Sequence, residues 1–250
     1  MTHLTNIRSL IVNADDFGQS AGVNDGVLRG HDEGIVTSAS LMVRWPAAAN
    51  AAEAALTRRG LSVGLHVDLG EWRLSGGQWQ AVYEVAELRD AGAVRAEVWS
   101  QLDQFRCLVG QDPSHLDSHQ HVHRREPVRT VLTELAGDLG VPLRHFAPTV
   151  RYCGDFYGHD EHGVQRPQVL RADYLIGLLE SLPPGATELA CHPAAAADLA
   201  TMYGRERLAE LEVLCDPRVR QAAAEFGIEL CSFHDVCTAR RDTAVVGEAR

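Results

Sequence analysis

Residues 9–18 read SLIVNADDFG, and they contain the pattern that recurs along the chain. A short apolar run typical of a buried strand occupies 9–14, and two adjacent carboxylates, Asp15 and Asp16, follow it. More apolar runs come later, and each is separated from the next by a helical pattern. Strands that alternate with helices in this way form a parallel sheet. We therefore expect an α/β fold with about seven parallel strands.

The expected strands cover residues 9–14, 36–43, 62–67, 114–119, 142–146, 187–191 and 228–233. The expected helices cover 23–31, 46–59, 127–139, 168–182, 205–214 and 217–226, with a further helical stretch at 81–109 that breaks in two at Gly92. Residues 70–80 and 148–167 are expected to be loops. Periodicity does not separate a closed barrel from an open, doubly wound sheet. Polar residues at the ends of several strands favour the barrel, because barrel enzymes build active sites on that rim.

Length, charge and cysteine content limit the class of protein. The 250 residues fit one domain over 1–240, followed by a disordered tail at 241–250. The formal net charge of −11 argues against a nucleic acid or an anionic membrane as partner. No apolar run approaches the roughly 18 residues that span a bilayer, and no signal peptide is visible at the first residues. The six cysteines include no CxxC pair, which indicates reduced thiols in a cytoplasmic protein.

The basic residues and the histidines are unusual. All 23 basic residues are arginine, so Schiff-base chemistry, a lysine general base and a Walker-type phosphate loop are excluded. The chain has 12 histidines, and five of them lie between His115 and His145. Histidine is a common metal ligand and proton carrier, so this region is a candidate site.

The doublet of Asp15 and Asp16 ends an apolar strand, where two carboxylates are unfavourable unless a positive charge lies beside them. A divalent cation supplies that charge, with one carboxylate as its ligand and the other free to act as a base. Alternatively, Asp16 or Ser20 caps the helix that follows. The doublet alone does not separate the two interpretations. Neighbouring strand residues face opposite ways, so both carboxylates reach one site only if the backbone turns there.

Two later motifs add imidazoles at the ends of other strands. GLHVDL places His66 in an apolar strand, where an isolated histidine is more often a core residue than a ligand. The motif HLDSHQHVH has a histidine or an aspartate at every second position, namely His115, Asp117, His119, His121 and His123. These residues share one face of a strand, whereas His119 and His123 share a face if the chain turns helical after residue 119. Asp117 could orient a ligating ring, and the alternative is a solvated polar loop.

The motif CHP ends a late strand with His192, and the following proline favours an extended exit. The alternative for His192 is a histidine in a surface loop. Together, carboxylates and imidazoles at four strand ends form a mononuclear site of the Asp/His/His type, with positions open for water and substrate. Such a site activates water near neutral pH. The residues therefore predict metal-assisted hydrolysis.

The sequence also resembles a known family. The motifs NADDFGQSAGVNDGVLRGHDEGIVTSASLMV, GLHVDL, HLDSHQHVH and CHP stand in the order found in the YdjC-like carbohydrate deacetylases, which include chitooligosaccharide deacetylases. The similarity spans roughly residues 10–236. It implies a single-domain, distorted β/α barrel related to the NodB-type polysaccharide deacetylases. It also implies an enzyme that removes acetyl groups from N-acetylated sugars.

The resemblance further implies roles for individual residues. Asp15 would be the general base, and His192 would be the acid or the oxyanion partner. One divalent ion, Mg²⁺ or Zn²⁺, would be held by Asp16, His66 and His119. His123 stands at HxxxH spacing from His119, as in the NodB motif, which leaves open whether it also binds the ion. Two imidazoles favour Zn²⁺ or another transition metal on ligand type alone.

The sugar itself is not specified by these motifs. Trp72, Trp79, Phe156 and Tyr157 are candidates to stack on a pyranose ring, and Asp117, His121 and His123 are candidates to orient ligands or to contact substrate. Chitobiose, monomeric N-acetylglucosamine derivatives and acetylated lipid-linked sugars all stay open, and so does a homodimer. The competing functions are a metal-dependent hydrolase of another amide or ester, and a sugar- or metal-binding relative without catalysis. The presence of both Asp15 and His192 weighs against the second of these, because binding alone needs neither.

Overall fold

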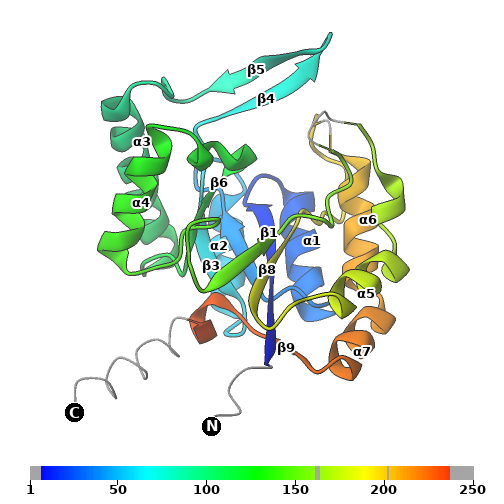
Figure 1. Cartoon of the computed structure of the whole chain (residues 1–250). Helices are drawn as coiled ribbons and strands as arrows, with labels where there is room; N and C mark the ends of the chain where they lie inside the picture. The colour runs from blue at the N-terminus through cyan, green and yellow to red at the C-terminus, as the bar shows by residue number, and fades with distance from the viewer. Residues whose placement is uncertain (1–6, 161–163, 202, 237–250) are drawn as a thin grey trace, which may run out of the picture.

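A computed structural model describes residues 7–160, 164–201 and 203–236, and Figure 1 shows how its elements are arranged. The tail predicted at 241–250 lies outside the described residues, as do the two ends of the domain predicted over 1–240. In the described part, the main sheet has seven strands, and every pairing between them is parallel. The prediction of an α/β fold with about seven parallel strands is therefore confirmed.

The strands of the main sheet are β1 (Arg8–Phe17), β2 (Ser38–Leu41), β3 (Ser62–Val67), β6 (Leu116–Ser118), β7 (Val150–Cys153), β8 (Gly185–Cys191) and β9 (Ile228–Leu230). They follow the order β6-β3-β2-β1-β8-β7, and β9 pairs with the start of β1. The described sheet is a curled half-barrel, and it is open because β6 and β7, the two ends of this order, do not pair with each other. Strand β1 is central and is buried from Leu10 onward. Its carboxyl end, with the Asp15–Asp16 doublet, therefore lies in the middle of the sheet.

The helices connect the strands and cover the sheet (Figure 1). They are α1 (Ala21–Asp32), α2 (Ala48–Leu56), α3 (Ala91–Val109), α4 (Val128–Leu139), α5 (Ala172–Glu180), α6 (Arg205–Leu214) and α7 (Pro217–Glu225), with two short 3₁₀ helices, η1 (His119–Arg124) and η2 (Pro167–Val169). Ser20 caps the start of α1, because its hydroxyl accepts a hydrogen bond from Val23 N. Within the described ranges, no helix is both long and apolar enough to cross a membrane.

The segment between β3 and α3 is an antiparallel hairpin of β4 (Gly70–Ser75) and β5 (Gln78–Glu84). Its turn is made by Gly76 and Gly77, whose φ angles of 59° and 77° are readily adopted by glycine. The prediction of a loop at 70–80 and of a helix from residue 81 is therefore wrong. The helix begins after Asp90, whose side chain accepts hydrogen bonds from the first turn, Gly92 N included. Gly92 thus lies at the start of one unbroken helix.

The chain before β8 also departs from prediction. Residues 142–146, predicted as a strand, contribute one isolated parallel bridge between Leu143 and Leu116. His145 has a φ of 66°, which takes the backbone out of the extended conformation. The strand lies later, since β7 forms inside the segment predicted as a loop and pairs with β8. Similarly, β6 ends at Ser118, so the predicted strand at 114–119 is too long and η1 begins at its last residue.

The hydrophobic core lies between the sheet and the surrounding helices, and its largest fully buried side chains include Phe17, Phe105, Phe156, Leu41 and Leu65. Because all main-sheet strands run in one direction, their carboxyl ends meet at one edge. The polar residues that end β1, β3, β6 and β8 are thereby brought together.

Candidate active site

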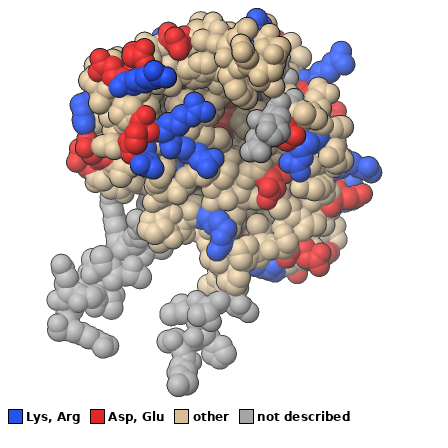
Figure 2. Space-filling view, turned by 45° about the horizontal axis from the view of Figure 1, so that its top comes forward, with Lys and Arg blue, Asp and Glu red and all other residues tan. Residues whose placement is uncertain are grey.

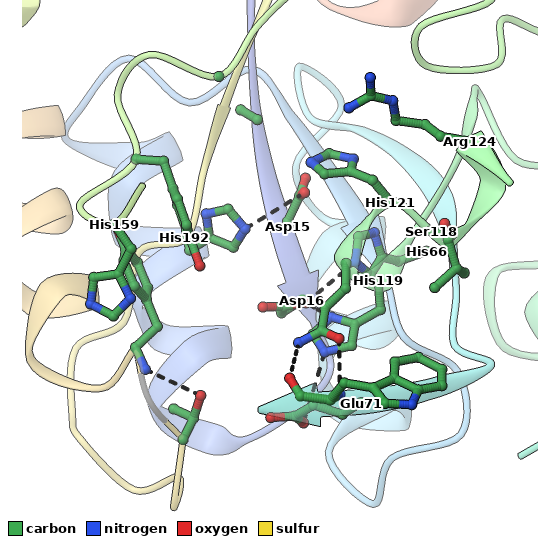
Figure 3. A pocket seen from close by; sticks show the side chains of 18 of the residues that line it. Asp15, Asp16, His66, Glu71, Ser118, His119, His121, Arg124, His159 and His192 are labelled. Carbon is green, nitrogen blue, oxygen red and sulfur yellow. Dashed lines mark hydrogen bonds and ion pairs between the residues drawn. The ribbon is translucent and has the colours of Figure 1, made fainter. Parts of the chain in front are cut away.

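A cavity of about 730 Å³ lies at the carboxyl ends of these strands. Figure 2 shows a hollow in this face, with arginine side chains gathered beside it, and Arg124 and Arg125 are among the residues that line the cavity. The hairpin of β4 and β5 contributes Trp72 and Trp79 to the lining, and α6 contributes Arg207. The interior is shown in Figure 3.

Asp15 and Asp16 have different partners in this cavity. Asp16 has a φ of 64°, so the backbone makes the turn that both carboxylates need in order to reach one site. Asp15 accepts hydrogen bonds from Nη1 and Nη2 of Arg144 at 2.6 and 2.7 Å. Asp16 accepts one from Nη2 of Arg207 at 2.5 Å. The alternative role of Asp16 as a helix cap is wrong, because Ser20 caps α1.

Asp16, His66 and His119 converge on one point (Figure 3). Oδ1 of Asp16 lies 3.3 Å from Nε2 of His66 and 2.9 Å from Nδ1 of His119. One possible ligand atom from each residue lies within 4.8 Å of the other two. Nε2 of His119 is buried and has no hydrogen-bond partner among the described residues. One carboxylate and two imidazoles suit a divalent transition metal, so the residues present fit such an ion.

The charges of these three residues are set by their neighbours. Burial alone would lower the pKa of His66 and His119, but Asp117 holds the pKa of His66 well above its usual value, and Asp16 raises that of His119 to about 9. Burial alone would raise the pKa of Asp16, but Arg207 and His119 bring it well below its usual value. Asp16 therefore offers an ionised oxygen to a cation. Because imidazole ligates only when neutral, a cation that binds here must displace protons.

Arg144 links three buried carboxylates beside this group. Its side chain is 0% exposed, and besides Asp15 it contacts Asp117 at 2.8 Å and Glu188 at 2.6 Å. Burial alone would raise the pKa of all three carboxyls. Arg144 outweighs burial at Asp15 and Asp117, whose pKa values lie below the usual range, whereas burial prevails at Glu188 and raises its pKa to about 7. Oδ1 of Asp117 also contacts Nδ1 of His66 at 2.7 Å, which orients that ring.

His192 approaches Asp15 from a separate strand end (Figure 3). Its Nε2 lies 3.8 Å from Oδ2 of Asp15, and its Nδ1 has no hydrogen-bond partner among the described residues. Burial lowers the pKa of His192 to about 4 despite the nearby carboxylates, so the ring is neutral at pH 7. The backbone N–H of His192 donates to Glu210, which also accepts a hydrogen bond from the hydroxyl of Tyr203. Burial raises the pKa of Glu210 to about 8.

The other residues of HLDSHQHVH separate into different environments. His115 stacks on Phe233 with 3.9 Å between ring centroids, and it belongs to the core. His121 and His123 gather with His145 in a group of their own. His123 therefore does not join Asp16, although it stands at HxxxH spacing in the sequence. The expectation that alternate residues share one face is wrong beyond Ser118, because β6 ends there.

The aromatic candidates divide into lining and core residues. Trp72, Trp79 and Tyr157 line the cavity, and Tyr157 stacks on Tyr203 with 4.4 Å between ring centroids. Phe156 is fully buried in the core, so the prediction that it contacts a sugar is wrong.

Several charged residues of this site are absent from the sequence-based predictions, among them Arg144, Arg207, Glu188 and Glu210. Arg144 lies in the loop after α4, and Arg207 and Glu210 lie on α6, where no motif marks them. The sequence gives one weak indication of Glu188, because this charged residue interrupts the apolar strand β8. A charge buried in such a strand requires a buried partner of opposite charge, here Arg144.

Known proteins resemble this chain in sequence. Residues 9–225 match the sequence profile of the family described as YdjC-like protein. A carbohydrate deacetylase from Geobacillus stearothermophilus is 34% identical over an alignment of 249 positions, which includes 91% of this chain and 98% of the relative. A chitooligosaccharide deacetylase from Serratia marcescens is 33% identical over an alignment of 257 positions, with the same coverage of 91% and 98%.

Solved structures share the fold. A candidate cellobiose-phosphate cleavage protein from Enterococcus faecalis superposes with a TM-score of 0.70 at 23% identity, over 92% of this chain and 99% of its own. The family 4 carbohydrate esterase from Streptomyces lividans, in complex with acetate, gives a TM-score of 0.54 at 13% identity over 91% of both chains. With a profile match over most of its length and relatives above 30% identity, the chain belongs to the YdjC-like protein family.

Proposed function

We propose that this chain is a metal-dependent deacetylase that hydrolyses the acetamide group of N-acetylated sugars. The observation that carries the proposal is the cluster of Asp16, His66 and His119 in a cavity, next to the ion-paired carboxylate of Asp15. The relatives named carbohydrate deacetylase and chitooligosaccharide deacetylase support the choice of an acetylated sugar. A cytoplasmic location and a homodimer stay predictions.

Asp16, His66 and His119 would hold the cation, which when bound would act as a Lewis acid toward the acetyl oxygen and the attacking water. Arg207 contacts the other oxygen of Asp16, and Asp117 contacts the far nitrogen of His66. These two contacts fix the direction of two of the three ligands. Two imidazoles among three ligands favour Zn²⁺ or a similar transition metal over Mg²⁺.

Asp15 is the proposed general base. Its two hydrogen bonds from Arg144 fix the plane of the carboxylate, and its lowered pKa keeps it ionised at neutral pH. An ionised carboxylate can accept a proton from the attacking water. The same ion pair makes Asp15 a weak base. Its contribution to catalysis therefore depends more on its position beside the attacking water than on its basicity.

His192 is the proposed donor of a proton to the leaving amine. Because the ring is neutral at pH 7, it must first receive the proton that it later gives. Asp15 lies 3.8 Å away and can supply the proton that it has taken from water. The C–O bond forms as water loses a proton to Asp15, and the C–N bond breaks as the amine gains a proton from His192. A single proton then serves both steps.

Aromatic side chains at the mouth of the cavity would contact the sugar. Trp72 is held in place by Gln120, which accepts a hydrogen bond from Trp72 N at 2.9 Å and donates one to Trp72 O at 2.8 Å. This pair connects the hairpin of β4 and β5 to η1. Trp79 is 55% exposed on the same hairpin, and exposed tryptophan rings beside a cavity suit stacking on a pyranose face.

The proposal is tested by acetate release from N-acetylglucosamine, chitobiose, chitotriose, an N-acetylated amino acid and an aryl acetate. We expect at least one N-acetylated sugar to give a higher kcat/KM than the N-acetylated amino acid. The Asp15→Asn variant should lose this activity. A preference for the non-sugar amide would favour the alternative hydrolase. Sugar binding without acetate release would favour the non-catalytic alternative.

A further inference from the structure

A second group of imidazoles lies beside the proposed active site. His121, His123 and His145 each offer one ring nitrogen, and these atoms lie within 4.8 Å of one another. The ring centroids form a triangle with sides of 5.9, 5.1 and 5.6 Å. The first two residues belong to η1, and the third belongs to the loop between α4 and β7. The group therefore connects two separate segments of the chain.

Each of the three rings has a buried nitrogen without a partner. Nδ1 of His121, Nε2 of His123 and Nε2 of His145 make no hydrogen bond to any residue in 7–160, 164–201 or 203–236. An unsatisfied buried polar group costs roughly 1–3 kcal/mol. In contrast, the core residue His115 uses both ring nitrogens, with Ser40 and Ser114 as partners. Three rings that meet at one point, each with a buried nitrogen left unsatisfied, indicate that a ligand belongs there.

The remaining nitrogens of two rings are held in the way that metal-ligating histidines usually are. Nδ1 of His123 lies 2.6 Å from Oγ of Ser118, and Nε2 of His121 lies 3.2 Å from Oη of Tyr152. When these nitrogens carry the proton and donate it, the lone pairs of the unpartnered nitrogens are free to bind a cation. The contacts thus support the tautomers that ligation requires.

The backbone is strained where the rings meet. His121 and His145 have φ angles of 54° and 66°, in the left-handed region that costs a residue other than glycine roughly 1–2 kcal/mol. Neither position is occupied by glycine or asparagine, which would adopt this conformation more easily. A ligand held by both side chains would offset the cost.

The local charge allows a cation to bind. Two arginines act on these rings. Arg124 is the positive group that acts most strongly on His145, whereas Arg144, which acts on all three rings, is paired with Asp15, Asp117 and Glu188. The charge of Arg144 is therefore balanced within its own cluster.

We propose that His121, His123 and His145 form a second metal site, which binds Zn²⁺ or a similar transition-metal ion through three imidazole nitrogens. Three nitrogen donors without a carboxylate suit such an ion and disfavour Mg²⁺, which takes oxygen ligands. The bound ion would tie the loop at His145 to η1, whose first residue is His119. This site shares no ligand with the group of Asp16, His66 and His119, and it does not depend on the proposed function.

The site is tested by calorimetric titration of the chelator-treated, full-length protein with ZnCl₂. The wild-type protein should bind two equivalents. His145→Asn should bind one, since asparagine tolerates the left-handed backbone but lacks the ring, and His66→Asn should also bind one. The double variant should bind none. His31→Asn, which changes a histidine of α1 outside both groups, should still bind two.

Cobalt binding and thermal melting give readouts independent of catalysis. In the His66→Asn variant, one equivalent of Co²⁺ should produce visible absorption bands, and Zn²⁺ should raise the Tm. Both effects should vanish in the double variant. A His66→Asn variant that binds no equivalent, or a His145→Asn variant that binds as many equivalents as the wild type, would overturn the proposal. If His145→Asn fails to fold, the His66→Asn variant decides alone, since binding of no equivalent there refutes the second site.

Discussion

Replacing Arg144 by methionine should destabilise the fold strongly, and more so as the pH rises. The guanidinium is fully buried and contacts Asp15, Asp117 and Glu188 at 2.6–2.8 Å. Methionine fills part of the same volume without a charge. The variant therefore leaves three buried carboxyls without their shared cation, while Asp117 keeps its contact with His66.

The expected loss in the free energy of unfolding is about 5 kcal/mol at pH 8, at the upper end of the roughly 3–5 kcal/mol measured when one partner of a buried pair is removed. The upper end is expected because three carboxyls share one cation. In the wild type, Asp15 and Asp117 have lowered pKa values, so the stability that they contribute is present above pH 3.8 and is lost as the pH falls further. In the variant, burial would raise their pKa values above 3.8. The variant should therefore lose stability as the pH rises.

Urea denaturation followed by circular dichroism at pH 5 and pH 8 measures this difference. The gap between wild type and Arg144→Met should be several-fold smaller at pH 5. Arg144→Lys should be intermediate, because an ammonium group keeps the charge but cannot make the forked contacts. Arg129→Met, which changes an exposed ion pair with Glu126, should stay close to wild type. A loss under about 1 kcal/mol, or an equal loss at both pH values, would refute the reasoning.

The remaining predictions concern three residues around the reaction centre. Asp15→Asn should keep its bound metal but lower kcat for acetate release on the order of 10²–10⁴-fold, and near-normal turnover would place the base elsewhere. His192→Ala should impair hydrolysis of an N-acetylated sugar far more than that of an aryl acetate, whose leaving group needs no proton. Equal losses would indicate oxyanion stabilisation instead. Glu210 has a folded pKa of about 8 against a usual 4.5, so its contribution to stability should decline as the pH rises between these values, because the unfolded state releases the proton first. Glu210→Gln should flatten this part of the urea-derived stability profile, and an unchanged slope from pH 5 to pH 8 would contradict the assignment.

Local patterns were sufficient for three of the strands that carry the candidate site. The apolar runs before Asp15, His66 and His192 form β1, β3 and β8, and each strand ends near the polar residue that the sequence places there. Parallel pairing then follows from the alternation of strands and helices, and it brings these ends to one edge. The turn at Asp16 is also inferable, because both members of the doublet reach one site only through it.

Contacts between distant segments lie beyond such patterns. Arg144 is one of 23 basic residues, and only folding brings it to Asp15, 129 positions earlier in the chain. The hairpin of β4 and β5 was missed because a paired glycine turn at Gly76 and Gly77 also suits an irregular loop. The grouping of His121 and His123 with His145 likewise depends on two left-handed turns, which the alternation of residues in the motif does not indicate.

The central claim is that a cation held by Asp16, His66 and His119 is required for deacetylation of an N-acetylated sugar. It is tested most directly by the initial rate of acetate release from the best sugar substrate after chelator treatment and stepwise return of Zn²⁺, with His145→Asn and His66→Ala measured alongside. We predict that the treated wild type and His145→Asn are inactive and recover with Zn²⁺, whereas His66→Ala stays inactive at every concentration. Full activity of the treated wild type, or recovery of His66→Ala to the wild-type rate, would contradict the claim.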